Sequence, residues 1–346
     1  MYETELWHAK SIANCKSIAW PYVQLPYPHI AFSPNRLKML LQSTLLCLFA
    51  LFQTSLANPI AAGKPKPVDL THSCMRVTSG TAKNDTTPII LLHGLAMAKE
   101  SWMGIYQLLA LKTSKRVCIA DLRNHGDSPW NKETDVASMA EDINRLLELL
   151  KAPKAIILGH SLGGKVAMHF TLNYPSKVEK LIVEDMRPNG LTTQALTEIK
   201  YFLVLIQQVT KIIPKGASEK EAKTVVISFL NEQLKKFNSS DLLDERAADF
   251  LPIKCSEGKC HWKTNVELFG EVLKNPLALL TESSGRFDNP TLFVYGTESP
   301  FKVKEDESSI KRLFPKAELV GVDGASHIVH TRPEFLDAVI KFINRA

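Results

Sequence analysis

Short apolar segments alternate with helical patterns along most of this chain of 346 residues, and this alternation restricts its fold more than any other feature. The segments have apolar centres rich in branched aliphatic residues, as buried strands do. They are residues 88–94, 115–123, 154–160, 180–185, 290–296 and 317–324. Helical stretches such as residues 136–150 separate them. The pattern predicts an α/β protein with a mostly parallel, doubly wound sheet covered by helices on both faces.

The alternation stops between residues 187 and 288, where apolar residues recur mainly at helical spacing. An insertion of this length between two strands is typical of a cap. We expect it over the carboxyl ends of the strands, where open α/β sheets bind ligands. We therefore predict a core of residues 69–186 and 289–346, with residues 187–288 forming a mainly helical cap.

Residues 158–166, LGHSLGGKV, place one serine among three glycines directly after an apolar segment. Two kinds of site use a similar pattern. A phosphate-binding P-loop has the form G-x-x-x-x-G-K-[ST], which the segment matches from Gly159 to Lys165. A nucleophile elbow has the form G-x-S-x-G, which it matches from Gly159 to Gly163 around Ser161. The first would bind a nucleotide, and the second would attack a carbonyl carbon.

The neighbouring residues favour the elbow. A P-loop needs Ser or Thr after its lysine to hold Mg²⁺, but Val166 stands there. An elbow needs small residues two positions before and two after the serine, because the strained turn leaves no space there. Gly159 and Gly163 meet this need. We therefore predict that Ser161 lies on a sharp turn at the N-terminus of a helix, whose dipole favours developing negative charge.

Four segments resemble the α/β-hydrolase-fold serine esterases, in the order of that family: LLHGLAMAKESW, DLRNHGDSP, LGHSLGGKVAM and GASHIVHTRPEF. Within the family, RNHGDSP, GHSLGGKVAM and FVYGTESPF are most similar to the abhydrolase-domain protein eleven group and its small bacterial esterase relatives. The resemblance extends from about residue 69 to the C-terminus. It implies the α/β-hydrolase fold with the cap inserted after the sixth strand, and a serine esterase that needs no cofactor and no metal.

The resemblance also implies a base for Ser161, because a serine hydroxyl is a weak nucleophile until a base takes its proton. His327 follows the last strand in a Gly-Ala turn and completes the Ser, acid, His order of this fold. We therefore predict His327 as the base. His330, three residues later, is expected to line the cap side or to begin the final helix.

The acid is expected at Asp185, which lies 24 residues after the serine and at the end of a strand. The family often places its acid after the seventh strand, but that position holds Ser299, which cannot carry a charge. Glu298 and Glu267 are the alternatives, and Asp185 could instead cap the following helix. Glu184, its neighbour, should point to the opposite face of the sheet if the strand still alternates there.

Two backbone N–H groups are expected to form an oxyanion hole: that of Leu162, directly after the nucleophile, and that of Leu95, after a His-Gly pair. His93 in that pair is expected to be structural. Residues 121–129 carry several polar side chains, and we expect this segment to be a scaffold as well.

These residues predict a serine hydrolase of carboxylic esters, thioesters or related acyl bonds that forms an acyl-enzyme intermediate. Apolar stretches of the cap fit a small-molecule substrate with a lipid-like or aromatic acyl group, and equally a cap that packs its own core. The alternative is a catalytically silent hydrolase fold used for binding, since fold alone does not establish activity. A P-loop nucleotide-binding protein is a remote alternative. The net charge of +6 is too small and its basic residues too scattered to indicate nucleic acid.

The N-terminus has the pattern of a targeting segment. Basic residues precede an apolar stretch, and Ser55-Leu56-Ala57 is a small-x-small cleavage pattern, so residues 39–57 are predicted to be a secretory signal peptide. Residues 1–38 form an N-terminal extension, and residues 58–68 a Pro-rich linker. We expect a secreted protein. A retained signal anchor and the mitochondrial location found in the resembling group are the alternatives.

Cysteines 255 and 260 flank SEGK, a segment with turn-forming residues. Cys255 and Cys260 could therefore face each other across a hairpin and form a disulfide in an oxidising compartment. Their spacing alone is a weak zinc pattern, and no second pair completes a tetrahedral site.

Overall fold

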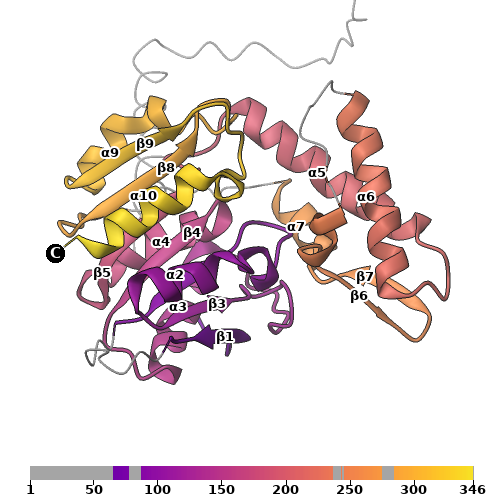
Figure 1. Cartoon of the computed structure of the whole chain (residues 1–346), viewed down its shortest axis with the longest axis horizontal. Helices are drawn as coiled ribbons and strands as arrows, with labels where there is room; N and C mark the ends of the chain where they lie inside the picture. Colours follow the sequence, from indigo (N-terminus) through magenta and orange to yellow (C-terminus); the bar gives the residue numbers. More distant parts are fainter. Residues whose placement is uncertain (1–64, 78–86, 237–242, 244, 275–283, 346) are drawn as a thin grey trace, which may run out of the picture. The chain divides into compact units, whose positions relative to one another are not determined.

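The computed structural model describes residues 65–77, 87–236, 243, 245–274 and 284–345. Lys64–Ala346 forms one compact unit, which contains the sheet and the expected cap (Figure 1). The expected signal peptide at residues 39–57 and most of the expected linker lie outside the described residues. None of the helices in the described ranges is long and apolar enough to cross a membrane.

The core contains a seven-stranded sheet in the order β1-β3-β2-β4-β5-β8-β9 (Figure 1). Every neighbouring pair of strands is parallel except β1 with β3. The mostly parallel, doubly wound sheet is thus confirmed. The edge strand β1 was not predicted, because its residues are only partly buried and form no apolar run. The strands are β1 (His72–Met75), β2 (Ile89–Leu92), β3 (Val117–Ala120), β4 (Ala155–His160), β5 (Val178–Glu184), β8 (Thr291–Gly296) and β9 (Ala317–Val322).

Helices pack on both faces of this sheet. In β2, Ile90 belongs to the hydrophobic cluster that includes residues of α3, α4 and α9, whereas its neighbour Ile89 belongs to the cluster that includes residues of α2 and α10. Both faces of the strands are therefore buried, which is why their sequences are continuously apolar. The helices are α2 (Ile105–Thr113), α3 (Val136–Leu149), α4 (Leu162–Asn173), α9 (Glu307–Leu313) and α10 (Pro333–Asn344).

The segment between β5 and β8 is mostly helical and also contains a small hairpin of strands β6 and β7 (Figure 1). β5 is the fifth strand of the described chain; the family's numbering used above counts it as the sixth. The elements are α5 (Thr193–Ile212), α6 (Glu219–Lys236), the 3-10 helix η3 (Glu245–Asp249), β6 (Ile253–Ser256), β7 (Lys259–Trp262) and α7 (Val266–Val272).

Three predicted site residues follow strands of the central sheet. Ser161 comes directly after β4, Asp185 directly after β5, and His327 lies in the loop after β9. Because β4, β5, β8 and β9 are parallel, their carboxyl ends meet at one edge of the sheet. The fold thus brings residues that are far apart in sequence to a single edge.

Candidate active site

Ser161 lies on the turn between β4 and α4, where its backbone has φ 51° and ψ −116°. Residues other than glycine rarely adopt such angles, and they do so mainly at functional sites. A Cβ atom at Gly159 would lie 2.2 Å from the carbonyl oxygen of Gly163, and one at Gly163 would lie 2.4 Å from the carbonyl oxygen of Leu92. Both glycines are therefore required by the close packing of this turn, as the elbow pattern predicts.

Lys165 does not occupy a position suited to a phosphate. Its side chain is buried, and its ammonium group donates a hydrogen bond to the carbonyl oxygen of Pro188. The nearby Gly164 has a packing role, because a Cβ atom there would lie 3.2 Å from side-chain atoms of Val183 and Met186. The geometry of this segment therefore favours the elbow over the P-loop.

Asp185 and His327 lie together. Nδ1 of His327 donates a hydrogen bond to Oδ2 of Asp185 at 2.7 Å, and the ring stacks on Phe301 with a centroid distance of 3.8 Å. A carboxylate at Nδ1 fixes the tautomer in which Nε2 can accept a proton. The alternative acids Glu298 and Glu267 are exposed. Asp185 is therefore the carboxylate that contacts the predicted base.

Two other groups hold the Asp185 carboxylate. The backbone N–H of Gly296 donates to Oδ1 at 3.0 Å, and the hydroxyl of Ser299 donates to Oδ2. Ser299 thus stands where the family's other acid is expected and donates a hydrogen bond to the acid used here. The next helix, α5, is capped by Thr192 instead, whose side chain accepts a hydrogen bond from Ala195 N–H. These contacts orient Asp185 toward the histidine.

Glu184 and His330 form a second carboxylate–histidine pair. Oε1 of Glu184 accepts hydrogen bonds from the backbone N–H of His330 at 2.8 Å and from its Nδ1 at 2.9 Å. Ile182 and Val183 of β5 belong to different hydrophobic clusters, so alternation along the strand places Glu184 on the side of α10. His330 lies in the 3-10 helix η5 (Val329–Thr331). The expectation that it lines the cap side or begins the final helix was wrong. Its side chain is buried instead, where it is hydrogen-bonded to Glu184.

His160 lies between the two pairs. Its Nε2 donates a hydrogen bond to the backbone oxygen of His327 at 3.0 Å, and its ring centroid lies 4.7 Å from that of His327 and 5.4 Å from that of His330. Burial lowers the pKa of His160 to about 3, so the ring is neutral at neutral pH. It therefore supports the backbone of His327 without adding a charge.

His160, Glu184 and His330 are also a group of described residues that could hold a metal ion, since their ligand atoms lie within 4.8 Å of one another. Imidazole and carboxylate ligands suit zinc. However, both oxygens of Glu184 already accept hydrogen bonds from Nδ1 of His330. A metal would have to displace these hydrogen bonds, so the arrangement favours a structural network over a metal site.

Leu95 and Leu162, the predicted oxyanion donors, both border the turn of Ser161. The N–H of Leu162 begins α4, where no preceding turn supplies an acceptor. The loop before Leu95 contacts the elbow directly, because Gly163 N–H donates to the carbonyl oxygen of His93 at 3.1 Å. Among the described residues, no protein acceptor takes a hydrogen bond from the backbone N–H of Leu95 or Leu162. Both groups are therefore available to a substrate.

His93 and His125 support the loop that follows β2. Nδ1 of His93 donates to the carbonyl oxygen of Gly94 at 2.8 Å, and its Nε2 accepts from Leu122 N–H at 3.0 Å. Nε2 of His125 accepts from Ala96 N–H at 3.2 Å. Burial lowers the pKa of His93 to about 4 and that of His125 to about 3, so both rings are neutral. These contacts match the structural role expected for His93.

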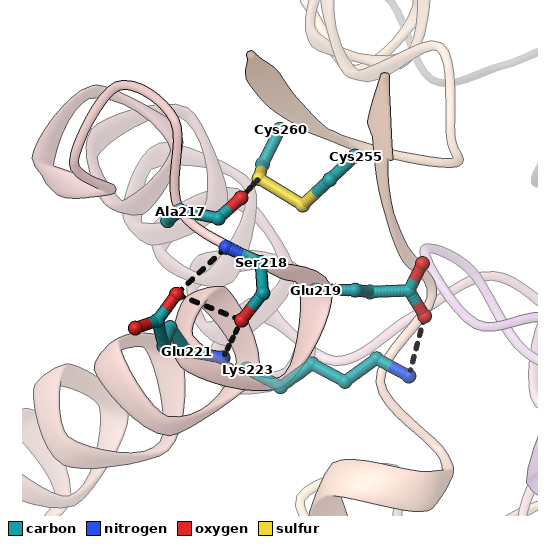
Figure 2. The surroundings of a disulfide bond; sticks show 7 residues. All are labelled: Ala217, Ser218, Glu219, Glu221, Lys223, Cys255 and Cys260. Atoms are coloured by element: carbon teal, nitrogen blue, oxygen red, sulfur yellow. Dashed lines mark hydrogen bonds and ion pairs between the residues drawn. A yellow bond between two sulfur atoms is a disulfide. The ribbon is translucent and has the colours of Figure 1, made fainter. Parts of the chain in front are cut away.

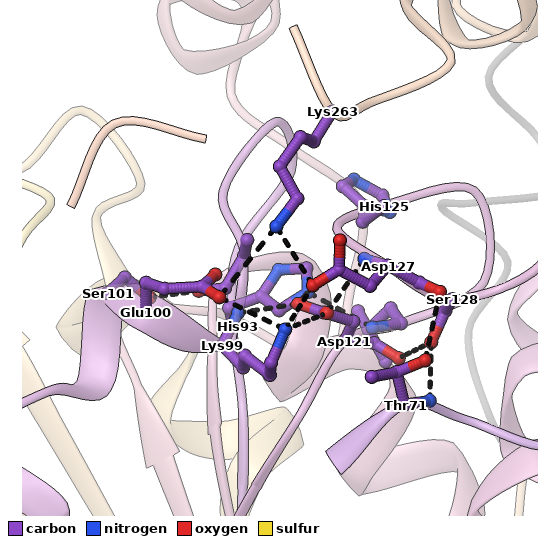
Figure 3. Close-up of polar contacts among 12 residues, drawn as sticks. Thr71, His93, Lys99, Glu100, Ser101, Asp121, His125, Asp127, Ser128 and Lys263 are labelled. Atoms are coloured by element: carbon purple, nitrogen blue, oxygen red, sulfur yellow. Dashed lines mark hydrogen bonds and ion pairs between the residues drawn. The ribbon is translucent and has the colours of Figure 1, made fainter. Parts of the chain in front are cut away.

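A network of charged residues connects the 121–129 segment to neighbouring elements (Figure 3). Asp121 is buried and accepts a hydrogen bond from Lys99 Nζ at 2.8 Å. Asp127 accepts from Lys99 at 2.7 Å and from Lys263, just after β7, at 3.0 Å. Burial opposes the charge on Lys99, but the surrounding carboxylates raise its pKa overall. The segment is thus a junction between the core and the β6–β7 hairpin.

Two disulfides are present in the described chain. Cys255 and Cys260 are paired across the β6–β7 hairpin, with their Cα atoms 4.0 Å apart, and Sγ of Cys260 lies 3.6 Å from the carbonyl oxygen of Ala217 (Figure 2). Cys74 and Cys118 join β1 to β3. This second bond was not predicted, because the pairing depends on the register of two strands that lie 44 residues apart.

The roles of His160 and Trp262 were not predicted from the sequence. The indole Nε1 of Trp262 donates a hydrogen bond to the carbonyl oxygen of Ala96 at 2.8 Å. No local pattern indicates this contact, which joins residues 166 positions apart. The position of His160 directly before the nucleophile is the only signal that could have singled it out.

Several known proteins are similar to this chain over most of its length. The sn-1-specific diacylglycerol lipase ABHD11 of Danio rerio is 32% identical over 282 residues, or 80% of this chain and 83% of that protein. Esterase YbfF of Escherichia coli is 28% identical over 273 residues, or 78% of this chain and 98% of that protein. A probable alcohol acetyltransferase of Saccharomyces cerevisiae is 29% identical over 330 residues, or 90% of this chain and 92% of that protein.

Among solved structures, a marine microorganism esterase superposes with a TM-score of 0.63 at 29% identity, covering 80% of this chain and 99% of its own. Residues 87–331 match the family model described as alpha/beta hydrolase fold. Together with the observed sheet and its inserted helices, these similarities show that the chain belongs to the α/β-hydrolase fold family.

Proposed function

We propose that this chain is a serine hydrolase that cleaves acyl esters through an acyl-enzyme intermediate, with Ser161 as nucleophile, His327 as base and Asp185 as acid. The observation that carries the proposal is the 2.7 Å hydrogen bond between His327 and Asp185, at the sheet edge where the strained turn holds Ser161. The names of the relatives, which include a lipase and an esterase, support the same reaction class.

The geometry suggests the following steps. Asp185 holds Nδ1–H of His327, so Nε2 takes the proton as the Ser161 oxygen attacks the ester carbonyl. The N–H groups of Leu95 and Leu162 stabilise the negative oxygen that develops. The protonated His327 then gives its proton to the departing alcohol, which leaves the acyl group on Ser161. Water, deprotonated by the same histidine, releases the acid and restores the serine.

Similarity to a probable alcohol acetyltransferase supports a second candidate, in which an alcohol replaces water in the final step. Both activities share the acyl-enzyme. Product analysis in buffer that contains added ethanol separates them, because transfer yields an ethyl ester and hydrolysis yields the free acid. We propose hydrolysis as the main reaction and an acyl group of lipid-like character, in line with the lipase and esterase names of the relatives.

A secretory route is proposed for the chain. The sequence pattern at residues 39–57 supports it, as do the two disulfides, since such bonds persist in oxidising compartments. Sequencing the N-terminus of the mature protein tests it. A start at Asn58 supports cleavage after Ala57, whereas an intact segment or a protein recovered from mitochondria contradicts it.

Replacement of the nucleophile tests the proposed reaction. Ser161→Ala should lower kcat for a short-chain nitrophenyl ester on the order of 10³-fold or more, with the fold intact. Ser101→Ala is the matched control, since Ser101 is buried to the same degree but donates its hydroxyl to the Ala98 carbonyl oxygen. Unchanged turnover in Ser161→Ala would exclude this mechanism.

A further inference from the structure

Trp262 connects the inserted segment to the loop that carries the proposed oxyanion donor Leu95. It is the last residue of β7, it is buried, and its Nε1–H donates a hydrogen bond to the carbonyl oxygen of Ala96 at 2.8 Å. Ala96 directly follows Leu95. The Ala96 carbonyl belongs to the Ala96–Met97 peptide, whose N–H donates to the carbonyl oxygen of Gly94 at 3.2 Å, so the contact acts on the short turn that carries the Leu95 N–H.

Ala96 is held from two sides in an unusual backbone conformation. Its φ is 60°, in the left-handed region that residues with a side chain rarely adopt. Its N–H donates to Nε2 of His125 at 3.2 Å, while its carbonyl oxygen accepts the indole hydrogen bond from Trp262. His125 can accept because burial keeps the ring neutral and its Nδ1 donates to the carbonyl oxygen of Arg123 at 2.9 Å. One anchor belongs to the core, and the other to the inserted segment.

The end of the hairpin is fixed at other points as well. Lys263 Nζ lies 3.0 Å from Oδ2 of Asp127 (Figure 3). The backbone N–H of Asn265 donates to the carbonyl oxygen of Asn124 at 2.9 Å. The Cys255–Cys260 disulfide closes the other end of the hairpin (Figure 2). Trp262 is thus presented to Ala96 from a rigid support, which is what precise positioning of a catalytic group requires.

We propose that Trp262 is a positioning residue that holds the turn of residues 94–97 so that the Leu95 N–H stabilises the oxyanion. The inserted segment then completes the oxyanion hole as well as covering the strand ends. This inference rests on the proposed function of Ser161 and Leu95.

The test compares two buried tryptophans. Trp262→Phe removes the bonded indole N–H, whereas Trp102→Phe removes one that has no acceptor in the described part of the chain. Trp262→Phe should lower kcat/KM for a nitrophenyl ester by about ten- to a hundredfold, less than the loss of a whole oxyanion donor. Its affinity for a trifluoromethyl ketone, which forms a tetrahedral adduct with serine, should fall in parallel while KM stays nearly constant. Trp102→Phe should change each quantity by less than about threefold.

Three results would overturn the proposal: unchanged kcat/KM and ketone affinity in Trp262→Phe, a loss confined to KM, or an equal loss in Trp102→Phe. If Trp262→Phe does not fold, 3-benzothienylalanine at position 262 exchanges the N–H for sulfur at nearly constant shape, and the same outcomes apply. Ser161→Ala separates this inference from the proposed function. If it loses activity while Trp262→Phe does not, only the role of Trp262 fails.

Discussion

Two carboxylate–histidine pairs lie side by side at the end of β5, and they differ in exposure. In the Asp185–His327 pair, the histidine side chain is 26% exposed and the carboxylate is buried. In the Glu184–His330 pair, the histidine side chain is 7% exposed and the carboxylate is again buried. The last residue of β5 and the residue directly after it thus build two pairs with the same Nδ1–carboxylate contact, but the histidine of the second pair is much less exposed to solvent.

The comparison shows that a hydrogen bond between a carboxylate and a histidine does not by itself identify a catalytic pair. A base must also meet the substrate, so the free nitrogen needs an open side. His327 meets this condition, while the ring of His330 is enclosed by Trp102, Phe335 and His160. We infer that the exposed pair transfers protons and that the buried pair holds the loop of His327 in place.

The largest expected effect is a difference in kcat between variants of the two neighbouring carboxylates. Asp185→Asn should lower kcat for ester hydrolysis by roughly 10³- to 10⁴-fold, because the histidine loses the partner that sets its tautomer. Glu184→Gln, one residue earlier, should lower it by less than about tenfold, since Glu184 acts only through the loop. Steady-state kinetics on one ester, with circular dichroism to verify folding, measures both. Similar losses in the two variants would contradict the assignment of roles.

For the free energy of unfolding, we expect the opposite order: the buried Glu184–His330 pair should contribute more than the exposed Asp185–His327 pair. His330→Gln should lower the free energy of unfolding by about 1–3 kcal/mol, because it takes hydrogen bonds from a fully buried carboxylate. His327→Gln should lower it by less than about 1 kcal/mol, since Gly296 and Ser299 still donate to Asp185 and water can reach the site. Urea unfolding provides the values. A larger loss of unfolding free energy in His327→Gln would mean that the exposed Asp185–His327 pair stabilises the fold more than the buried pair does.

The pH dependence of the free energy of unfolding tests the role of His160, whose ring contacts the histidines of both pairs. Burial lowers the pKa of His160 to about 3 in the fold, against about 6.5 in an unfolded chain. The unfolded state therefore binds a proton that the folded state does not, and the free energy of unfolding falls as pH drops below about 6.5. His93 and His125 add to the slope in the same direction.

His160→Gln should make this slope shallower by up to one proton, or about 1.4 kcal/mol per pH unit. Urea unfolding at several values between pH 4 and 8 measures it. Glu184 contributes a separate loss at lower pH. Burial acts to raise its pKa, but His330 and His160 lower it overall, so its contribution disappears only as pH falls through that lowered value. An unchanged slope in His160→Gln would show that His160 is not the buried neutral group described here.

The smallest effect concerns Ser299, whose hydroxyl donates a hydrogen bond to Asp185; among the described residues, no hydroxyl donates to Glu184. Ser299→Ala should lower kcat by about three- to tenfold, because one hydrogen bond to the carboxylate is lost while Gly296 still donates the other. The same kinetic assay measures this. A loss as large as that of Asp185→Asn would assign Ser299 a much greater part in holding the acid.

The strands of the central sheet and the elbow could be predicted because buried parallel strands and a strained turn leave local signals. Gly159 and Gly163 are such a signal, because a side chain at either position would collide with atoms of the turn or of β2. Asp185 was accessible only through resemblance to a family, because many strands end in a carboxylate.

The remaining features depend on contacts between distant elements. Cys74 faces Cys118 only because β1 runs antiparallel to β3 in one register. His330 meets Glu184 across 146 residues, and Trp262 meets Ala96 across 166 residues. Nothing in the local sequence at these positions encodes the partner, so such pairs become visible only once the chain is folded.

Covalent labelling of Ser161 tests the central claim most directly. The intact protein is treated with a fluorophosphonate, which reacts with an activated serine, and the modified peptide is identified by mass spectrometry. We predict a single adduct on Ser161, formed at a comparable rate in Glu184→Gln and far more slowly in Asp185→Asn. No adduct, an adduct on another residue, or equal rates in the two carboxylate variants would contradict the account.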